Sequence, residues 1–254
     1  MMLCEWKTEW MKVRRKKIVL IPAAFLLFTF LWLSWAVRST HVDSAEDSWM
    51  WLLLCISIVN TILMPTMIAM LASRLCDVEL KGNTLKLLCT MERKGRLFDM
   101  KLLTGAVYVE GYVAMELVMM LVFARTHGFA GGLTLRHLIC FLLQCGLVSL
   151  GVLLFQMLLS LFSANQILPL AVGLAGSFLG LFSWFMSSPF WRVIVWSYYN
   201  LLAYIGQNWE ESSHVVSFYE RPLDQTALVT LLAALSIGYV WSRQLFMRRT
   251  PGCG

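Results

Sequence analysis

All but one of the 21 lysine and arginine residues lie outside six long apolar stretches, and this restricts the fold more than any other feature. Each stretch is near or above the ~20 residues that a helix rising ~1.5 Å per residue needs to cross a bilayer. The exception, Arg243, lies near the end of the last one. The stretches cover residues 18–37, 49–73, 102–124, 137–162, 166–187 and 226–247.

Composition supports membrane insertion. Hydrophobic residues make up 59% of the chain, charged residues only 14%, and the mean hydropathy is +0.69. Backbone amides and carbonyls inside lipid must be hydrogen-bonded within the protein, which favours helices. We therefore predict an all-α integral membrane protein in which residues 18–247 form a single domain of six transmembrane helices.

The basic residues are distributed unequally between the connecting segments. Six lie in residues 1–17, seven in residues 74–101, and three more are Arg243, Arg248 and Arg249. Only five lie in the opposite segments: Arg38, Arg125, Arg136, Arg192 and Arg221. Because lysine and arginine stay on the cytoplasmic side, we predict that both termini are cytoplasmic, including a tail at 248–254. We therefore expect the net charge of +6 to attract anionic lipid headgroups and expect no nucleic-acid partner.

The N-terminal segment is amphipathic. Trp6, Trp10 and Val13 recur at offsets of four and three, opposite much of the positive charge. Residues 1–17 are thus predicted to form a helix lying on the inner leaflet in contact with membrane lipid.

A cleaved signal peptide is not expected, because the following apolar run is too long. None of the seven cysteines lies in an outer loop, so no disulfides are expected.

The connection at 74–101 is the only sizeable cytoplasmic segment between the predicted helices. Asn83 and Thr84 are suited to cap a short helix with Leu85, Leu88 and Cys89 on one face. Such a helix is suited to docking on a partner. The alternative is an ordinary charged loop that only fixes the topology.

This connection resembles the cytoplasmic loop of ABC-2-type exporter permeases, especially the lantibiotic and bacteriocin self-immunity permeases. The resemblance implies that the loop forms a coupling helix held in a cleft of an ATPase subunit. It also covers the N-terminal helix, the six spans and a long outer segment before the last one. The matching residues are Glu79, Asn83, Thr84, Lys86, Leu87, Leu88, Arg93, Arg96 and Lys101.

The resemblance implies a transport subunit rather than an enzyme. The chain has no Gly-x-x-x-x-Gly-Lys-Ser/Thr loop to hold nucleotide phosphates. It would therefore bind no cofactor itself, and ATP and Mg would be bound by a partner. The implied assembly has two ABC ATPase subunits and a second permease, identical or related. It would remove a bacteriocin-like peptide from the bacterial cytoplasmic membrane.

Two carboxylates, Glu110 and Glu116, fall within the third apolar stretch. A spacing of six residues places them ~120° apart on a helix, so paired-carboxylate chemistry is not expected. They could form hydrogen bonds between helices, to Asn60, Gln144 or Gln156. Alternatively, Glu110, Glu116 and Asn60 could line a transport pathway. If they bound a proton or cation, the chain could instead be a secondary carrier or uptake component for a small solute.

The outer segment at 188–225 is rich in aromatic residues, which prefer the headgroup layer. We expect a re-entrant or interfacial segment, and its apolar part through Ile205 resembles the short outer helices that precede the last span in ABC-2 permeases. The segment could be only an anchor, or its aromatic and acidic residues could contact a cationic peptide in the outer leaflet. The residues proposed for that contact are Trp191, Trp196, Tyr199, Trp209, Glu210 and Glu211.

Other functions have less support. The four histidines show no zinc-like spacing, so no metal site is expected. An intramembrane enzyme would need His, Asp or Ser groups together at the membrane midplane, and the sequence offers no such set. Gly173, Gly176 and Gly180 in the fifth stretch are explained by close packing against a neighbouring helix.

Overall fold

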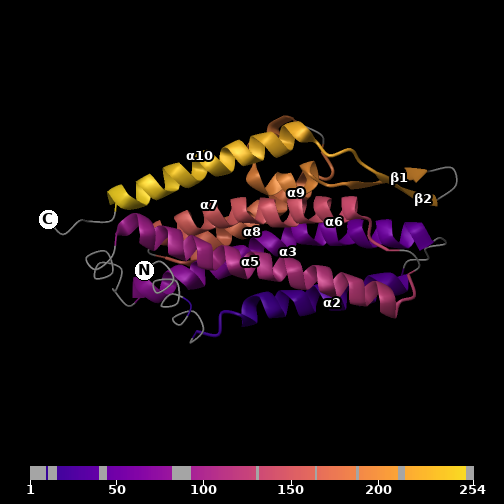
Figure 1. Cartoon of the computed structure of the whole chain (residues 1–254), viewed down its shortest axis with the longest axis horizontal. Helices are drawn as coiled ribbons and strands as arrows, with labels where there is room; N and C mark the ends of the chain where they lie inside the picture. The colour runs from indigo at the N-terminus through magenta and orange to yellow at the C-terminus, as the bar shows by residue number, and fades with distance from the viewer. Residues whose placement is uncertain are drawn as a thin grey trace.

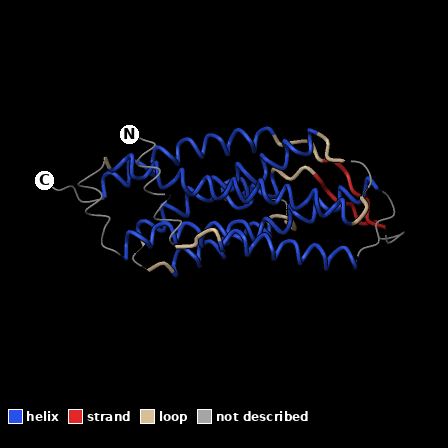
Figure 2. The backbone as a smooth tube through the Cα atoms, turned by 60° about the horizontal axis from the view of Figure 1, so that its bottom comes forward, coloured by secondary structure: helices blue, strands red, loops and turns tan. Residues whose placement is uncertain are grey.

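The computed structural model describes residue 10 and residues 16–39, 45–81, 93–129, 132–163, 165–186, 189–210 and 215–249. These residues form an elongated bundle of helices that run along one axis, with a small hairpin at one end (Figures 1 and 2). The all-α membrane architecture predicted from the apolar stretches is confirmed.

Each predicted apolar stretch lies mainly in helix. The elements are α2 (Leu20–Ser39), α3 (Ala45–Lys81), α5 (Lys94–Thr126), α6 (Leu135–Phe141), the π-helix η1 (Leu142–Leu147), α7 (Val148–Phe162), α8 (Ile167–Phe182) and α10 (Gln225–Arg249). In the described part of the chain, five helices are long and apolar enough to cross a membrane, with α6, η1 and α7 counted as one. The helix α8 is apolar but has only 16 residues, so a sixth crossing stays a prediction.

Two helices continue beyond the predicted apolar stretches. α3 extends to Lys81 and α5 begins at Lys94, which places several charged residues in helix rather than loop. A helix satisfies its own backbone hydrogen bonds in water as well as in lipid, so the membrane boundary need not end it. The fourth stretch differs in another way, because the π-helical segment η1 interrupts its α-helix. A hydropathy pattern does not predict such an interruption.

The helix α3 forms the centre of the bundle. It packs most extensively on α8 and α7, whereas α2 and α10 lie at the periphery and keep most of their surface exposed (Figure 1). The contact between α3 and α8 is close at Gly173, where an added Cβ would lie 2.4 Å from the Cβ of Ala69. The expected packing role of glycine in the fifth stretch is thus confirmed at this position.

The outer segment is only partly helical. The 3-10 helices η2 (Pro189–Val193) and η3 (Val195–Ser197) lead into α9 (Tyr198–Leu201). An antiparallel hairpin follows, in which β1 (Ile205–Glu210) pairs with β2 (Val215–Glu220). The short helices expected in the apolar part through Ile205 thus correspond to η2, η3 and α9, and the hairpin after them was not predicted. The run from Val215 to Tyr219 contains β-branched and aromatic residues, which favour strands.

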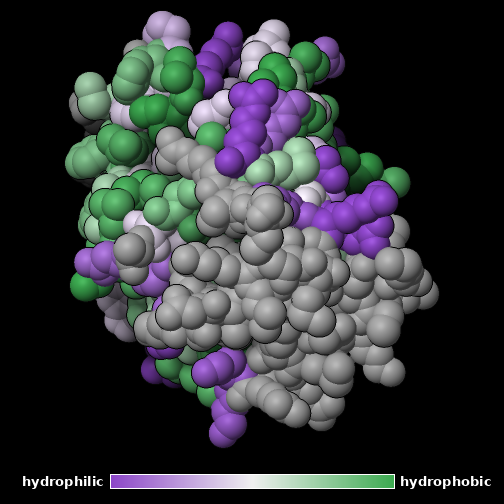
Figure 3. Space-filling view, turned by 90° about the vertical axis from the view of Figure 1, so that its left-hand side faces the viewer, coloured by the Kyte–Doolittle hydropathy of each residue, from purple (hydrophilic) through white to green (hydrophobic). Residues whose placement is uncertain are grey.

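The two ends of the bundle are different. The end of α3, the start of α5 and the end of α10 share one end, and the hairpin lies at the other (Figure 1). Figure 3 views the first end, where hydrophilic side chains lie among hydrophobic ones on the described surface. We call this the terminal end, and the opposite one the hairpin end.

Candidate functional site

A polar cluster lies inside the bundle where α3, α5 and η1 meet. Asn60 Nδ2 donates a hydrogen bond to Glu116 Oε2 at 2.8 Å and approaches Cys145 Sγ at 3.3 Å. All three side chains are fully buried. Because polar groups at this depth need partners, this contact satisfies part of the hydrogen-bonding need of both Asn60 and Glu116 and fastens α3 to α5. Among the described residues, Asn60 Oδ1 and Glu116 Oε1 have no hydrogen-bond partner.

A second set of hydrogen bonds joins η1 to the outer segment. Gln144 accepts from Ser57 Oγ at 3.0 Å and donates to the carbonyl of Tyr199 at 2.5 Å. The hydroxyl of Tyr199 lies 2.8 Å from Ser149 Oγ. The π-helical segment therefore supplies both Gln144 and Cys145 to the interior. π-Helical turns often occur at functional sites.

Glu110 takes a different position from Glu116. It is half-buried, and its carboxylate lies beside Gly146, where an added Cβ would be 3.1 Å from Glu110 Oε2. Its other oxygen, Oε1, has no hydrogen-bond partner among the described residues. Glu110 thus approaches Gly146 of η1 directly, whereas Glu116 is linked to the neighbouring Cys145 through Asn60. Gln156, the third amide considered as a partner, instead lies against Gly173 of α8.

The residues expected to meet a peptide in the outer leaflet have unequal exposure. Tyr199 is fully buried, so the contact expected of it is not available in this conformation. Trp196 packs edge-on against Phe155 and lies over Gly176, where an added Cβ would be 2.2 Å from its ring. Trp191 is 9% exposed and donates from Nε1 to the carbonyl of Met186. The side chains of Trp209 and Glu210, and all of Glu211, lie outside the described residues.

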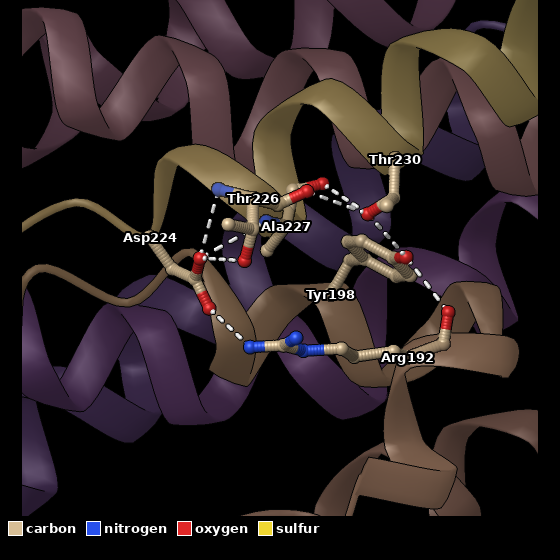
Figure 4. Close-up of polar contacts among 6 residues, drawn as sticks. All are labelled: Arg192, Tyr198, Asp224, Thr226, Ala227 and Thr230. Atoms are coloured by element: carbon tan, nitrogen blue, oxygen red, sulfur yellow. Dashed lines mark hydrogen bonds and ion pairs between the residues drawn. The ribbon is translucent and has the colours of Figure 1, made fainter.

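Asp224 organises the start of α10 (Figure 4). Its Oδ1 accepts from the amides of Thr226 at 2.9 Å and Ala227 at 3.0 Å, and Arg192 donates to its Oδ2 at 3.2 Å. This is the geometry of a helix N-cap. The hydrogen bond from the Thr226 hydroxyl and that from the Ala227 amide hold the pKa of Asp224 below its ordinary value.

Glu220 at the end of β2 is also paired. It accepts a short hydrogen bond from Arg136 and lies 2.8 Å from His137 Nε2, both at the start of α6. These contacts fix the hairpin to the bundle. They also engage Glu220, just as Arg192 engages Asp224, so two of the outer acidic residues already have cationic neighbours.

The terminal end holds a junction between α5 and α10 that sequence reasoning did not identify. Arg243 Nε donates to both oxygens of Asp99, at 3.0 and 3.1 Å, and Tyr239 donates to Asp99 Oδ1 at 2.8 Å. Gly95 makes room, because a Cβ there would lie 2.6 Å from the Arg243 guanidinium. The signal was the isolated position of Arg243 in an apolar stretch, since such a charge needs a partner.

The residues predicted to couple to an ATPase are only partly described. Asn83, Thr84, Lys86, Leu87 and Leu88 lie outside the described residues, as does the side chain of Glu79. Arg93 precedes α5 and is exposed, and Arg96 is half-buried in its first turn. Lys101 is buried, and its Nζ donates to the carbonyl of Leu75 at 3.2 Å. It therefore joins α5 to α3 and is not available for docking in this conformation.

Two further expectations concern the N-terminus and metals. Most of residues 1–17, the predicted amphipathic helix, lie outside the described residues, but Trp10 is described and stacks on Tyr108 with ring centroids 5.3 Å apart. Within the described part of the chain, no three His, Cys, Asp or Glu side chains are grouped as metal ligands.

Comparison with known proteins identifies the class of this chain. The family model described as "ABC-2 family transporter protein" matches residues 6–180, which include the polar cluster and the connection between α3 and α5. No curated protein and no solved structure matches the chain. The family implies association with an ABC ATPase subunit. Because the family match covers more than half of its length, this protein belongs to the ABC-2 transporter family and is a membrane permease subunit.

Proposed function

We propose that this permease belongs to an ATP-driven exporter that removes a lantibiotic or bacteriocin-like peptide from the bacterial cytoplasmic membrane. The observation that carries the proposal is the family match over residues 6–180, which includes the whole connection at 74–101. In the proposed assembly, two ATPase subunits bind ATP and Mg and act on two permeases, either identical or related. The peptide class rests on the resemblance to self-immunity permeases.

The ATPase is proposed to dock at the terminal end. Residues 1–17, residues 74–101 and the end of α10 together hold most of the basic residues, and this distribution favours a cytoplasmic location. The docked residues would be Glu79, Asn83, Thr84, Lys86, Leu87, Leu88, Arg93 and Arg96. On ATP binding, movement of the connection would pass into α3 and α5, which Lys101 holds together.

The transport pathway is proposed to pass the polar cluster. Glu110, Glu116 and Asn60 lie in helices that flank the connection. Each side chain has a buried oxygen with no hydrogen-bond partner in the part of the chain that the structure describes. Rocking of α5 against α3 and η1 would exchange the Asn60–Glu116 contact for contacts with substrate or water. At the hairpin end, Trp191, Trp209, Glu210 and Glu211 are the proposed contacts for a cationic peptide in the outer leaflet.

Co-purification with the ATPase tests the coupling proposal. The double variant Leu87→Asp and Leu88→Asp places two charges on the proposed docking helix, and we expect at least a tenfold loss of recovered ATPase. The matched control is Ser212→Asp with Ser213→Asp in the hairpin connection, which should leave recovery unchanged. Equal recovery with both double variants would contradict docking through residues 74–101.

Resistance assays test the substrate. Cells that express the permeases with their ATPase should tolerate a higher concentration of a cationic lantibiotic than cells with an ATPase that cannot hydrolyse ATP. An unchanged inhibitory concentration across a panel of such peptides would refute the peptide assignment while leaving ATPase docking intact. Transport driven by a proton gradient in the isolated permease would instead support a secondary carrier.

A further inference from the structure

An apolar groove opens between the start of α2 and the middle of α5. It has a volume of about 400 Å³ and is lined on one side by Val19, Pro22, Ala23 and Leu26 of the α2 segment. The facing wall and the rim are formed by Trp10, Val107, Tyr108, Gly111, Tyr112 and Met115. Both helices run in the same direction, so the groove follows them for roughly 10 Å at ~1.5 Å per residue.

The groove continues into a basic mouth. A second cavity of about 300 Å³ shares Trp10, Val19 and Tyr108 with the first and adds Ile18 and Lys17. Lys17 adopts a left-handed backbone conformation, with φ of 51°, in the turn that precedes α2. Lys16 and Lys17 are exposed, and within the described part of the chain neither forms an ion pair.

The residues that line the groove differ along its length, because Lys17 lies at the mouth and apolar side chains line the interior. Among the described residues, none that lines either cavity is acidic, and Glu110, the acidic residue next in sequence to the groove wall, is directed at Gly146 instead. Trp10 and Tyr108 stack between the basic mouth and the apolar interior. Aromatic residues prefer this level of a membrane protein, where an apolar surface meets polar headgroups.

We propose that this groove binds one anionic phospholipid of the inner leaflet, with an acyl chain between α2 and α5 and the phosphate beside Lys17. The apolar walls match a hydrocarbon chain, and the lysines match a negative headgroup. A cationic peptide would meet like charge at the mouth, so the exported substrate is a poor occupant. Tethering by lipid would hold α2, most of whose surface is exposed, beside α5.

Gly111 provides the principal test of occupancy. It lies in a helix with nothing within 4 Å of an added Cβ, so Gly111→Leu should fill the groove without disturbing the fold. The full-length permease, purified in detergent and mixed with phosphatidylglycerol, should hold one fewer lipid by native mass spectrometry when it carries this substitution. Ala23→Leu, from the opposite wall, should give the same loss.

A matched control exists between α7 and α10. Gly238 lines an apolar cavity of about 150 Å³ in which none of the described lining residues is charged, and a Cβ there would meet only ordinary contact with Leu154. Gly238→Leu should therefore leave the bound phosphatidylglycerol unchanged. A phosphatidylglycerol with a photoreactive acyl chain should crosslink to the wild-type segments around Val19–Leu26 and Val107–Met115.

The headgroup preference tests the role of the basic mouth. Wild-type permease should bind phosphatidylglycerol more tightly than phosphatidylcholine, and Lys17→Gln should reduce that preference about fivefold, the effect of ~1 kcal/mol per basic residue near an anionic surface. Equal lipid binding by wild type and both groove-filling variants would overturn the proposal. So would a change from dimer to monomer in Gly111→Leu with no lipid lost, because the groove would then be a contact between permeases.

Discussion

At the scale of single residues, the buried pair of Asn60 and Glu116 shows how a polar contact can serve a helix bundle in lipid. The pair joins α3 to α5 at 2.8 Å, inside a bundle whose core consists largely of apolar side chains. Its proposed second role, in the transport pathway, requires that the contact can break. Substitutions can separate the two roles because glutamine keeps the shape and an acceptor oxygen, whereas alanine removes both.

We expect Glu116→Ala to lower the stability of the permease by about 1 kcal/mol, the upper part of the range for hydrogen bonds between helices in membranes. Glu116→Gln should cost less than half of that, measured as the apparent melting temperature in detergent. If Glu116 lines the pathway, Glu116→Gln should still reduce peptide export severalfold in vesicles. Unchanged export by both Glu116→Gln and Glu110→Gln, in permease that assembles normally, would leave these residues with packing roles only.

The cap formed by Asp224 leads to a second prediction. Asp224→Ala removes the acceptor for two helix amides and should destabilise the start of α10 by about 1 kcal/mol. Because the pKa of Asp224 is lowered in the folded protein, ionisation contributes stability above the unfolded pKa of about 4, and that contribution disappears as the pH falls through the folded pKa. The difference in melting temperature should thus be constant from about pH 6 to 8 and shrink at lower pH. A difference that grows on acidification would contradict this.

At the scale of elements, the junction of Asp99 with Arg243 and Tyr239 joins α5 to α10. α5 is the helix that follows the proposed coupling connection. Phe98 adds an apolar contact with Phe246, with ring centroids 5.7 Å apart. α5 would therefore not move alone when the connection is displaced. Movement at the ATPase would also be transmitted to α10.

Variants of this junction should uncouple ATP hydrolysis from transport. We expect Arg243→Ala and Asp99→Ala to cost about 1 kcal/mol each, because the pair is partly exposed. Both should retain the bound ATPase yet export less peptide per ATP hydrolysed. The exchange variant, Asp99→Arg with Arg243→Asp, should recover part of the coupling. Failure of the single variants to change the ratio of transport to hydrolysis would show that α10 is not driven through this contact.

At the scale of the whole molecule, the arrangement of the helix ends makes a prediction about topology. The end of α3, the start of α5 and the end of α10 share the terminal end, and the hairpin lies at the opposite one (Figure 1). In a cysteine-free variant, Lys86→Cys should react with a membrane-impermeant maleimide only in inside-out vesicles, and Ser212→Cys only in intact cells. Labelling of Lys86→Cys in intact cells would reverse the orientation and remove the docking site from the ATPase.

Hydropathy and charge alone were sufficient to predict the helical membrane fold, because lipid leaves few alternatives for a chain with long apolar stretches. The family resemblance in residues 79–101 led to the correct transporter family. Asn60 was one of three side chains named as possible partners of the carboxylates, since few polar side chains lie at that depth. These features depend on local sequence and on the solvent around it.

Only the tertiary structure showed which polar groups meet. The contacts of Arg243 with Asp99 and of Glu220 with His137 join residues more than 80 positions apart, and no periodicity encodes such a distance. The π-helix at Leu142–Leu147 and the burial of Tyr199 depend on how neighbouring elements pack, as does the groove between α2 and α5. The sequence by itself determined that the chain enters the membrane as helices, because that depends on transfer from water to lipid. Which faces of those helices touch was decided by shape and by the pairing of scarce polar groups, and both are properties of the assembled bundle.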